Sequence, residues 1–138
     1  MNSYPVNCFT RKTALLIAFT AFVFLNTAHG QKSVKKIFYG QASFYHNKFN
    51  GRQTANGEIF SQKKMTCACN ALPFGTWVKI TNMRNGKTVI VKVNDRLHPR
   101  MKRVADLSYT AAKKIGYTGH GLARVKVEVL GKTKPVGA

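Results

Sequence analysis

The run TWVKITNMRNGKTVIVKV, residues 76–93, decides the fold class of this chain. In each half of the run, apolar and polar side chains alternate with a period of two, which is typical of a strand with one buried face. Asn85 and Gly86 stand between the halves, and both residues tolerate the positive φ of a tight reversal. The run therefore predicts an antiparallel hairpin whose strands, 76–82 and 88–93, are joined by a type I′ turn.

The same alternation places an acidic residue. Val89, Val91 and Val93 share the buried face of the second strand, and Asp95 follows in the same register as the strand ends. We therefore expect the Asp95 carboxylate at the mouth of a sheet or barrel, with its basic sequence neighbours on the other face.

Further strand patterns flank the hairpin. Residues 38–45 and 122–130 are predicted strands, and residues 65–72 are a short strand or an irregular segment. Asn56-Gly57 marks another tight turn, so Glu58, which follows it, is expected at a rim rather than in a core.

One segment has a helical period. The apolar residues of segment 106–116 recur every four positions, Asp106 or Ser108 is placed to cap its start, and Gly116 is placed to end it. Many short strands with one short helix predict a small all-β barrel, since closure removes the sheet edges.

The first thirty residues have the three parts of a secretory signal. Arg11-Lys12 precede an apolar run over residues 13–25, and Ala28-His29-Gly30 provides small residues for cleavage before Gln31. No cysteine follows the expected cleavage point, so no stable membrane anchor is expected. We expect a signal peptide at 1–30, a basic leader at 31–38, a barrel domain at 39–130 and a polar tail at 131–138.

The net charge favours a polyanionic neighbourhood. It is +19 for the whole chain, and removal of residues 1–30 takes away Arg11 and Lys12 and no acid, which leaves +17. The lysines are dispersed rather than gathered in one stripe between aromatic residues, and the chain is expected to be exported. Both features argue against nucleic acid as a partner.

Cysteine and histidine usage predicts no metal or cofactor. Cys67 and Cys69 are one residue apart, which in a strand separates their Cα atoms by ~6.6 Å, near the limit for a disulfide. A bridge between them is therefore disfavoured. A zinc site would need further ligands from His46, His98 or His120, whose spacing matches no zinc motif.

Five motifs in order resemble the rare lipoprotein A family of septal-ring lytic transglycosylases. They are GQASFY at 40–45, GRQTANGE at 51–58, LPFG at 72–75, VNDR at 93–96 and DLSY at 106–109. The resemblance covers residues 39–130. It implies a six-stranded double-psi β-barrel related to expansins and barwin-like domains. It also implies a bacterial envelope enzyme that cleaves peptidoglycan glycan strands, with a preference for strands stripped of stem peptides.

The chain departs from the family pattern at two places beside the expected site. Cys69 stands where the family usually has a histidine, and Leu97-His98-Pro99 stands where the family continues with Gly-Pro-Phe. The lipid-anchor cysteine and the C-terminal glycan-binding repeat that many members carry are also not found in this sequence.

A lytic transglycosylase splits the bond between N-acetylmuramic acid and N-acetylglucosamine without water, because the 6-hydroxyl of the sugar captures the anomeric carbon. One carboxyl group can act first as acid and then as base. We expect Asp95 in that catalytic role, and the resemblance implies Glu58 as its catalytic partner. The expected substrate-binding residues are Asp106, Asn56, Tyr45, His98 and Tyr109.

Three functions remain open from the sequence. The first is a periplasmic or secreted endolytic transglycosylase, a monomer acting on peptidoglycan strands and working beside other cell-wall or division-site proteins. The second is an expansin-like module that binds glycan without cutting it. The third is a secreted basic interaction protein that uses the barrel as a scaffold, and it predicts polyanion binding that salt abolishes and that does not depend on Asp95.

Overall fold

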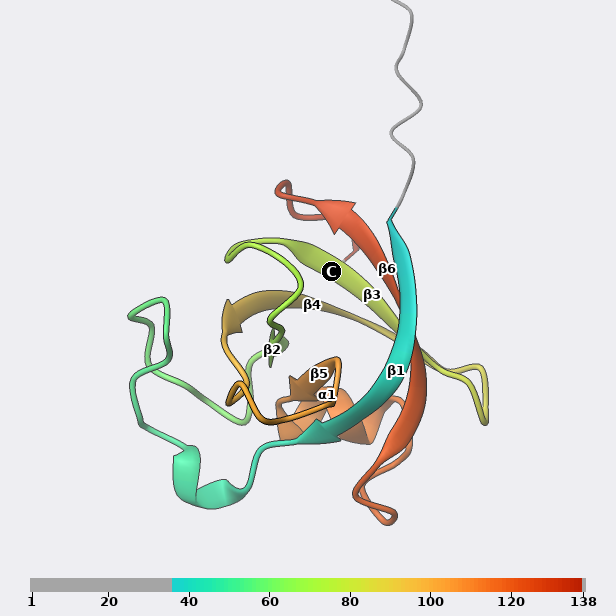
Figure 1. Cartoon of the computed structure of the whole chain (residues 1–138), viewed down its shortest axis with the longest axis horizontal. Coiled ribbons are helices and arrows are strands. Elements are labelled where there is room, and N and C mark those ends of the chain that lie inside the picture. The colour runs from blue at the N-terminus through green and yellow to red at the C-terminus, as the bar shows by residue number, and fades with distance from the viewer. Residues whose placement is uncertain (1–35, 138) are drawn as a thin grey trace, which may run out of the picture. The chain divides into compact units, whose positions relative to one another are not determined.

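The computed structural model describes residues 36–137, and the expected signal peptide lies outside these residues. Six strands close into a barrel in the order β1-β5-β2-β4-β3-β6, which confirms the predicted all-β barrel (Figure 1). Its elements are β1 (Ile37–Phe44), the 3-10 helix η1 (Asn47–Phe49), β2 (Thr66–Ala68), β3 (Trp77–Asn82), β4 (Thr88–Asp95), β5 (Ala105–Leu107), α1 (Tyr109–Lys114) and β6 (Ala123–Gly131).

The barrel mixes parallel and antiparallel pairs. β1 runs parallel to β5, and β2 runs parallel to β4, whereas the pairs β2–β5, β3–β4, β3–β6 and β1–β6 are antiparallel. Each parallel pair needs a long connection between its strands. The connection between β1 and β5 contains the loops that form the candidate site.

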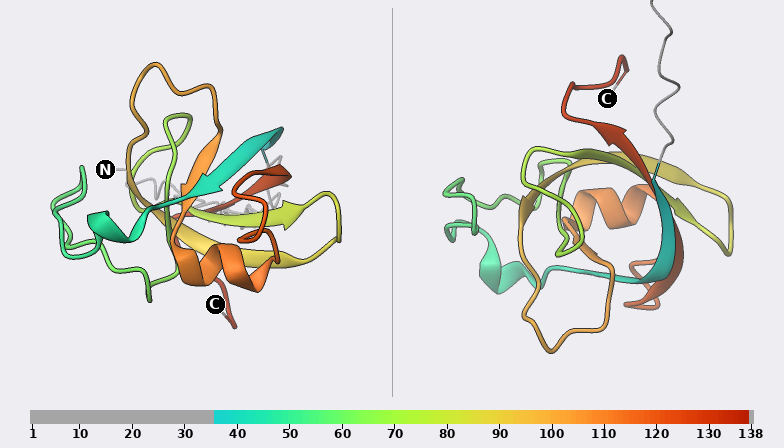
Figure 2. Two further views of the ribbon diagram at one scale, coloured as in Figure 1. Left: turned by 90° about the horizontal axis from the view of Figure 1, so that it is seen from below. Right: turned by 45° about the horizontal axis from the view of Figure 1, so that its top comes forward.

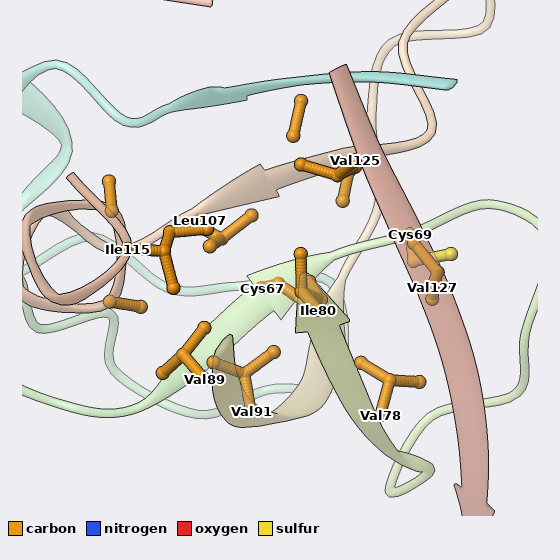
Figure 3. Packing of buried hydrophobic residues seen from close by; sticks show 14 of the residues in the cluster. Cys67, Cys69, Val78, Ile80, Val89, Val91, Leu107, Ile115, Val125 and Val127 are labelled. Atoms are coloured by element: carbon orange, nitrogen blue, oxygen red, sulfur yellow. The ribbon is translucent and has the colours of Figure 1, made fainter. Parts of the chain in front are cut away.

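The predicted register places the valines in the barrel interior. Val89, Val91 and Val93 are at most 2% exposed and belong to one core cluster with side chains from β3 and β6. Figure 3 shows part of this cluster, with Val89 and Val91 labelled. Ala111, Ala112 and Ile115 of the α1 segment join the same cluster, where each is fully buried. The helix lies across one end of the barrel (Figures 1 and 2). Within residues 36–137, no helix is long and apolar enough to cross a membrane.

The hairpin prediction was right and its turn type was wrong. The backbone N–H of Asn82 donates to the carbonyl of Lys87 (2.9 Å), so the loop has four residues, 83–86, instead of two. Gly86 lies in the loop with a positive φ of +71°. The Asn82 side chain favours the four-residue loop over the two-residue turn, because its Oδ1 accepts from the N–H of Arg84 (3.0 Å) and stabilises the longer loop.

A β-bulge lies where β4 ends. Cys67 of β2 pairs with Val93, but the next residue, Ala68, pairs with Asp95, so Asn94 is the extra residue. Asn94 is 1% exposed, whereas Asp95 is partly exposed. A bulge bends its strand and redirects the following side chain. Asp95 is thereby presented at the barrel rim.

A glycine allows the segment between β4 and β5 to lie on the barrel. The N–H of Val104 donates to the carbonyl of Gln41 in β1 (2.8 Å). A Cβ at Gly40 would collide with the Val104 side chain. The contact fixes the C-terminal end of segment 96–104, which forms one wall of the site.

Candidate active site

A cavity of about 560 Å³ lies between the barrel rim and two long loops. One wall comes from the segment that follows β1, shown in green in Figure 1, and the other from segment 96–103. Ser43 and Asp106, which are register partners on β1 and β5, lie in the lining. Asp95 from the end of β4 lies there as well, so two of the four acidic residues of the sequence line one cavity.

Three donors hold the Asp95 carboxylate. Its Oδ1 accepts from the N–H of Ala55 (2.9 Å) and from the N–H of Arg96 (2.8 Å), and its Oδ2 accepts from the hydroxyl of Tyr45 (2.6 Å). The two backbone donors occupy one oxygen. The second oxygen, which only the tyrosine contacts, keeps capacity for a further hydrogen bond or a proton.

The Tyr45 hydroxyl remains a hydrogen-bond donor. Burial first, and then its hydrogen bond to Asp95, raise the pKa of Tyr45 above its ordinary value, so the phenol stays protonated. Its ring packs against Phe60 at 4.4 Å and against Phe49 at 6.0 Å between ring centroids. These contacts fix the hydroxyl beside Asp95.

The second carboxylate of the cavity is held by an arginine. Arg103 donates from Nε to Asp106 Oδ1 (2.9 Å) and from Nη2 to Oδ2 (3.1 Å), and Ser43 Oγ also donates to Oδ1. The hydrogen bond to Asp106 raises the pKa of the Arg103 guanidinium. A two-pronged pair of this kind fixes the plane of the carboxylate.

Of the two helix caps that the sequence left open, Asp106 and Ser108, the structure has Ser108, so the predicted segment 106–116 is helical over a shorter range. Asp106 lies in β5, and α1 begins only at Tyr109. The cap is Ser108, whose Oγ accepts from the N–H of Ala111 (3.3 Å). Strand pairing of Asp106 with both Ser43 and Ala68 outweighs the helical period of the segment. Asp106 consequently faces the cavity instead of the helix end.

Comparisons with known proteins identify the family of the chain. Residues 37–127 match the family described as lytic transglycolase. The chain belongs to this family.

Relatives within the lytic transglycolase family carry names that state an activity. The chain is 54% identical over 89 residues to the "Endolytic peptidoglycan transglycosylase RlpA" of Pseudomonas aeruginosa, covering 64% of this chain and 26% of that protein. It is 45% identical over 106 residues to the "Probable endolytic peptidoglycan transglycosylase RlpA" of Synechocystis, covering 77% of this chain and 33% of that protein. The chain thus spans about a quarter to a third of the length of these relatives.

Solved structures share the fold. The apo expansin of Clavibacter michiganensis is 20% identical, with a TM-score of 0.58 over 72% of this chain and 53% of that chain. The Streptomyces papain inhibitor is also 20% identical, with a TM-score of 0.55 over 68% of this chain and 94% of that chain. These likenesses show the fold alone, and with the family match they confirm the double-psi β-barrel expected from the sequence.

Glu58, the family's glutamate, lies outside the cavity lining. Its Oε2 accepts from Asn94 Nδ2 (3.1 Å) and its Oε1 from Lys92 Nζ (3.3 Å). The hydrogen bond from Asn94, with further help from Asn56 and Lys92, lowers the pKa of Glu58. The carboxylate therefore anchors its loop to β4, and Ala55 of the same loop donates to Asp95.

The expected substrate-binding residues divide into two groups. Tyr45, His98 and Asp106 line the cavity with Asp95. Asn56 does not, because its Oδ1 accepts from Thr54 Oγ1 (2.6 Å) and from the N–H of Glu58 (3.1 Å) within the turn. Tyr109 lines a separate adjoining hollow of about 330 Å³, which shares Phe44, Tyr45 and His46 with the main cavity.

At the position of the family's usual histidine, Cys69 is part of the core. Its side chain is 2% exposed and does not line the cavity, and its thiol is free (Figure 3). Its backbone still supports the site, because the N–H donates to the carbonyl of Asp95 (3.1 Å) and the carbonyl accepts from Arg96 Nη1 (2.6 Å). The Arg96 guanidinium lies 3.8 Å from the centre of the Phe74 ring, so this ring and the Cys69 carbonyl together fix its position.

The sequence offers Arg52, Arg96 and Arg103 as possible ion partners of a loop-capping Asp95, and not as substrate-binding residues. All three lie in the cavity lining, and among the described residues none of them forms an ion pair with Asp95. Arg52 and Arg96 belong to the quoted motifs GRQTANGE and VNDR, so a signal for their place at the site was present. Among the residues that the structure describes, no three His, Cys, Asp or Glu side chains gather in a way that could hold a metal ion.

Proposed function

We propose that this protein is an endolytic lytic transglycosylase that cleaves peptidoglycan between N-acetylmuramic acid and N-acetylglucosamine and leaves 1,6-anhydro ends. The observation that carries the proposal is the Asp95 carboxylate, held by three donors in a cavity beside Tyr45. The family and the names of its relatives support the same activity. The reaction needs no cofactor or metal.

Asp95 serves as the general acid and then as the general base. In the first step its carboxyl group gives a proton to the glycosidic oxygen as the bond to the anomeric carbon breaks. Oδ2 carries this proton, because both backbone donors point at Oδ1. In the second step the carboxylate takes the proton of the 6-hydroxyl, whose oxygen bonds to the anomeric carbon. Tyr45 stays protonated throughout and orients Oδ2.

Asp106 binds the sugar rather than transferring protons. Its oxygens are engaged by Arg103 and Ser43, and their remaining lone pairs can accept from sugar hydroxyls. His98, which is exposed at the rim, serves as a further substrate contact. Glu58 assists catalysis through its loop, because it holds the segment whose Ala55 N–H reaches Asp95.

A preference for strands without stem peptides has a basis in charge. Removal of the peptide leaves a free lactyl carboxylate on each muramic acid. Arg52 lines the cavity, its guanidinium lies 5.5 Å from the Phe49 ring centre, and among the described residues it forms no ion pair with a carboxylate. Arg52 is therefore available to the lactyl carboxylate of a stripped strand.

We place the protein in the cell envelope, periplasmic or secreted, as a monomer that acts on glycan strands and works beside other wall or division-site proteins. The sequence pattern of a signal peptide and the peptidoglycan named for its relatives support this location.

The test is mass spectrometry of soluble fragments released from purified glycan strands, with and without stem peptides. The parent protein is expected to release anhydro-ended fragments and Asp95→Asn to release none. Glu128→Gln is the matched control, since Glu128 pairs with Lys79 and Lys126 away from the cavity. Hydrolytic ends, or equal activity of Asp95→Asn, would contradict the proposal.

A second function is a module that binds glycan without cutting it. The observation that favours it is Cys69, since the core position of this side chain leaves the cavity without the family's usual histidine. Co-sedimentation of the parent and Asp95→Asn with glycan, without fragments from either protein, is the outcome that would establish this alternative.

A further inference from the structure

A second cavity, of about 480 Å³, lies away from Asp95. Its walls come from the β3–β4 hairpin, from the loop between α1 and β6, and from the start of β6. The hairpin projects on the opposite side of the barrel from the green loop of the candidate active site (Figures 1 and 2). The two cavities share no lining residue.

Hydrogen bonds fix the walls of this cavity. Asn82 and Asn85 both donate from Nδ2 to the carbonyl of Ile115, at 2.8 and 3.0 Å, which ties the hairpin to the end of the helix segment. The N–H of Met83 donates to the carbonyl of Arg124 (2.9 Å). Arg84, the next residue of the hairpin, and Arg124 therefore lie at one cavity.

The cavity gathers cations that have no acidic partner. Arg84 Nη1 lies 3.0 Å from His120 Nε2, and since a guanidinium only donates, Nε2 is the acceptor. The sequence has four acidic residues, and Glu58, Asp95, Asp106 and Glu128 are all engaged elsewhere. None of them lines this cavity, so among the described residues nothing neutralises Arg84 and Arg124.

We propose that this cavity binds the phosphate group of a larger ligand, between Arg84 and Arg124. A phosphate offers more acceptor oxygens and more negative charge than a carboxylate, so it can satisfy two guanidinium groups at once. The volume exceeds what a free phosphate ion needs, and Tyr117 and Leu122 provide apolar lining for the rest of the ligand. A sugar phosphate and a lipid headgroup share this chemistry. The proposal does not depend on the transglycosylase activity.

The test is titration calorimetry of the purified protein with glucose 6-phosphate. Glucose and glucuronate serve as its neutral and carboxylate counterparts. The lipid source is tested by co-flotation with phosphatidylcholine vesicles that contain one-fifth phosphatidic acid. The variant is Arg84→Gln/Arg124→Gln, and the charge-matched control is Lys63→Gln/Lys64→Gln, whose lysines are exposed and line neither cavity.

Binding of glucose 6-phosphate or of the vesicles should weaken about tenfold or more in the arginine variant and persist in the lysine variant. Whichever probe binds identifies the source of the phosphate. Three results would overturn the proposal: neither probe binds the parent, both variants weaken equally because only the net charge matters, or glucuronate binds as tightly as glucose 6-phosphate.

Discussion

The hydroxyl of Tyr45 donates a 2.6 Å hydrogen bond to Oδ2 of Asp95, across 50 positions of sequence. The bond joins the residue after β1 to the last residue of β4, two strands that are not neighbours in the barrel. The orientation of the proposed catalytic carboxylate therefore depends on both barrel closure and the bulge at Asn94.

Tyr45→Phe tests this orientation. The substitution keeps the ring between Phe49 and Phe60 and removes only the hydrogen bond to Asp95. Hydrogen bonds to charged groups contribute about 1.5–3 kcal/mol, so release of anhydro fragments should slow by roughly tenfold to a hundredfold. Tyr39→Phe, at an exposed position outside the cavity, is the control. An unchanged rate in Tyr45→Phe would remove Tyr45 from the mechanism.

Glu58→Gln tests the anchoring of the 54–58 loop. The hydrogen bond from Asn94 lowers the pKa of Glu58 in the folded state. The ionised carboxylate therefore adds to the free energy of unfolding above the unfolded pKa of about 4.3, and this stabilisation is lost as the pH falls through the lower folded pKa. Because the side chain is 36% exposed, the contribution at pH 7 should be below about 1 kcal/mol.

Melting temperatures measured from neutral pH down to about pH 3 should show the parent above Glu58→Gln at neutral pH, with the two curves converging in acid. A difference in melting temperature that stays constant over the whole pH range would show that the charge of Glu58 does not stabilise the fold.

Gly40→Ala tests the close packing of segment 96–104 on β1. The new methyl group would collide with Val104, and such overpacking costs about 1–3 kcal/mol. Denaturant unfolding should show this loss in Gly40→Ala and its partial recovery in Gly40→Ala/Val104→Ala, where room is restored. If the loss of unfolding free energy in the double variant equals the sum of the losses in Gly40→Ala and Val104→Ala, the collision does not cause the destabilisation.

Two of the three cysteines of the sequence, Cys67 and Cys69, lie in the barrel domain, and the mature protein without residues 1–30 provides a test of their burial. Cys67 and Cys69 are free and at most 2% exposed, and burial raises the pKa of both thiols. A thiolate-specific reagent should therefore leave both unmodified in the native protein at pH 7 and modify both in denaturant. Rapid labelling of Cys69 in the folded protein would place it in the cavity after all, where the family's histidine is expected.

The sequence predicts most of the fold because alternation is a local signal. The strands at 38–45, 76–82, 88–93 and 122–130 each match an observed strand to within two residues at either end. It extends the helical segment to Asp106, because the three-residue strand β5 is too short to show a period and is stabilised by pairing with distant Ser43 and Ala68. The four-residue hairpin loop was missed for a similar reason. Asn82 at the end of β3 and Asn85 in the loop both donate to the carbonyl of Ile115, which lies 33 and 30 positions away in the sequence.

The candidate site is predictable only in part. Register placed Asp95 at the rim, and the structure has it in the cavity lining. Whether Glu58 and Tyr109 share that lining depends on how loops fold back on the barrel. Glu58 accepts a hydrogen bond from Asn94, 36 positions away, and the Tyr109 ring contacts the Phe44 ring, 65 positions away. No spacing of residues in the sequence predicts contacts of this kind.

Arg52→Gln tests substrate selection. If Arg52 pairs with the lactyl carboxylate of stripped strands, the variant should lose about twofold to fivefold in kcat/KM on such strands, as expected for one exposed ion pair. Strands that keep their stem peptides lack that free carboxylate and should be affected less, so the ratio between the two substrates falls. Arg52→Lys keeps the charge without the guanidinium fork and should lie between the parent and Arg52→Gln. Equal losses of kcat/KM on both substrates would mean that Arg52 stabilises the loop through its contact with the Phe49 ring and does not recognise the lactyl carboxylate.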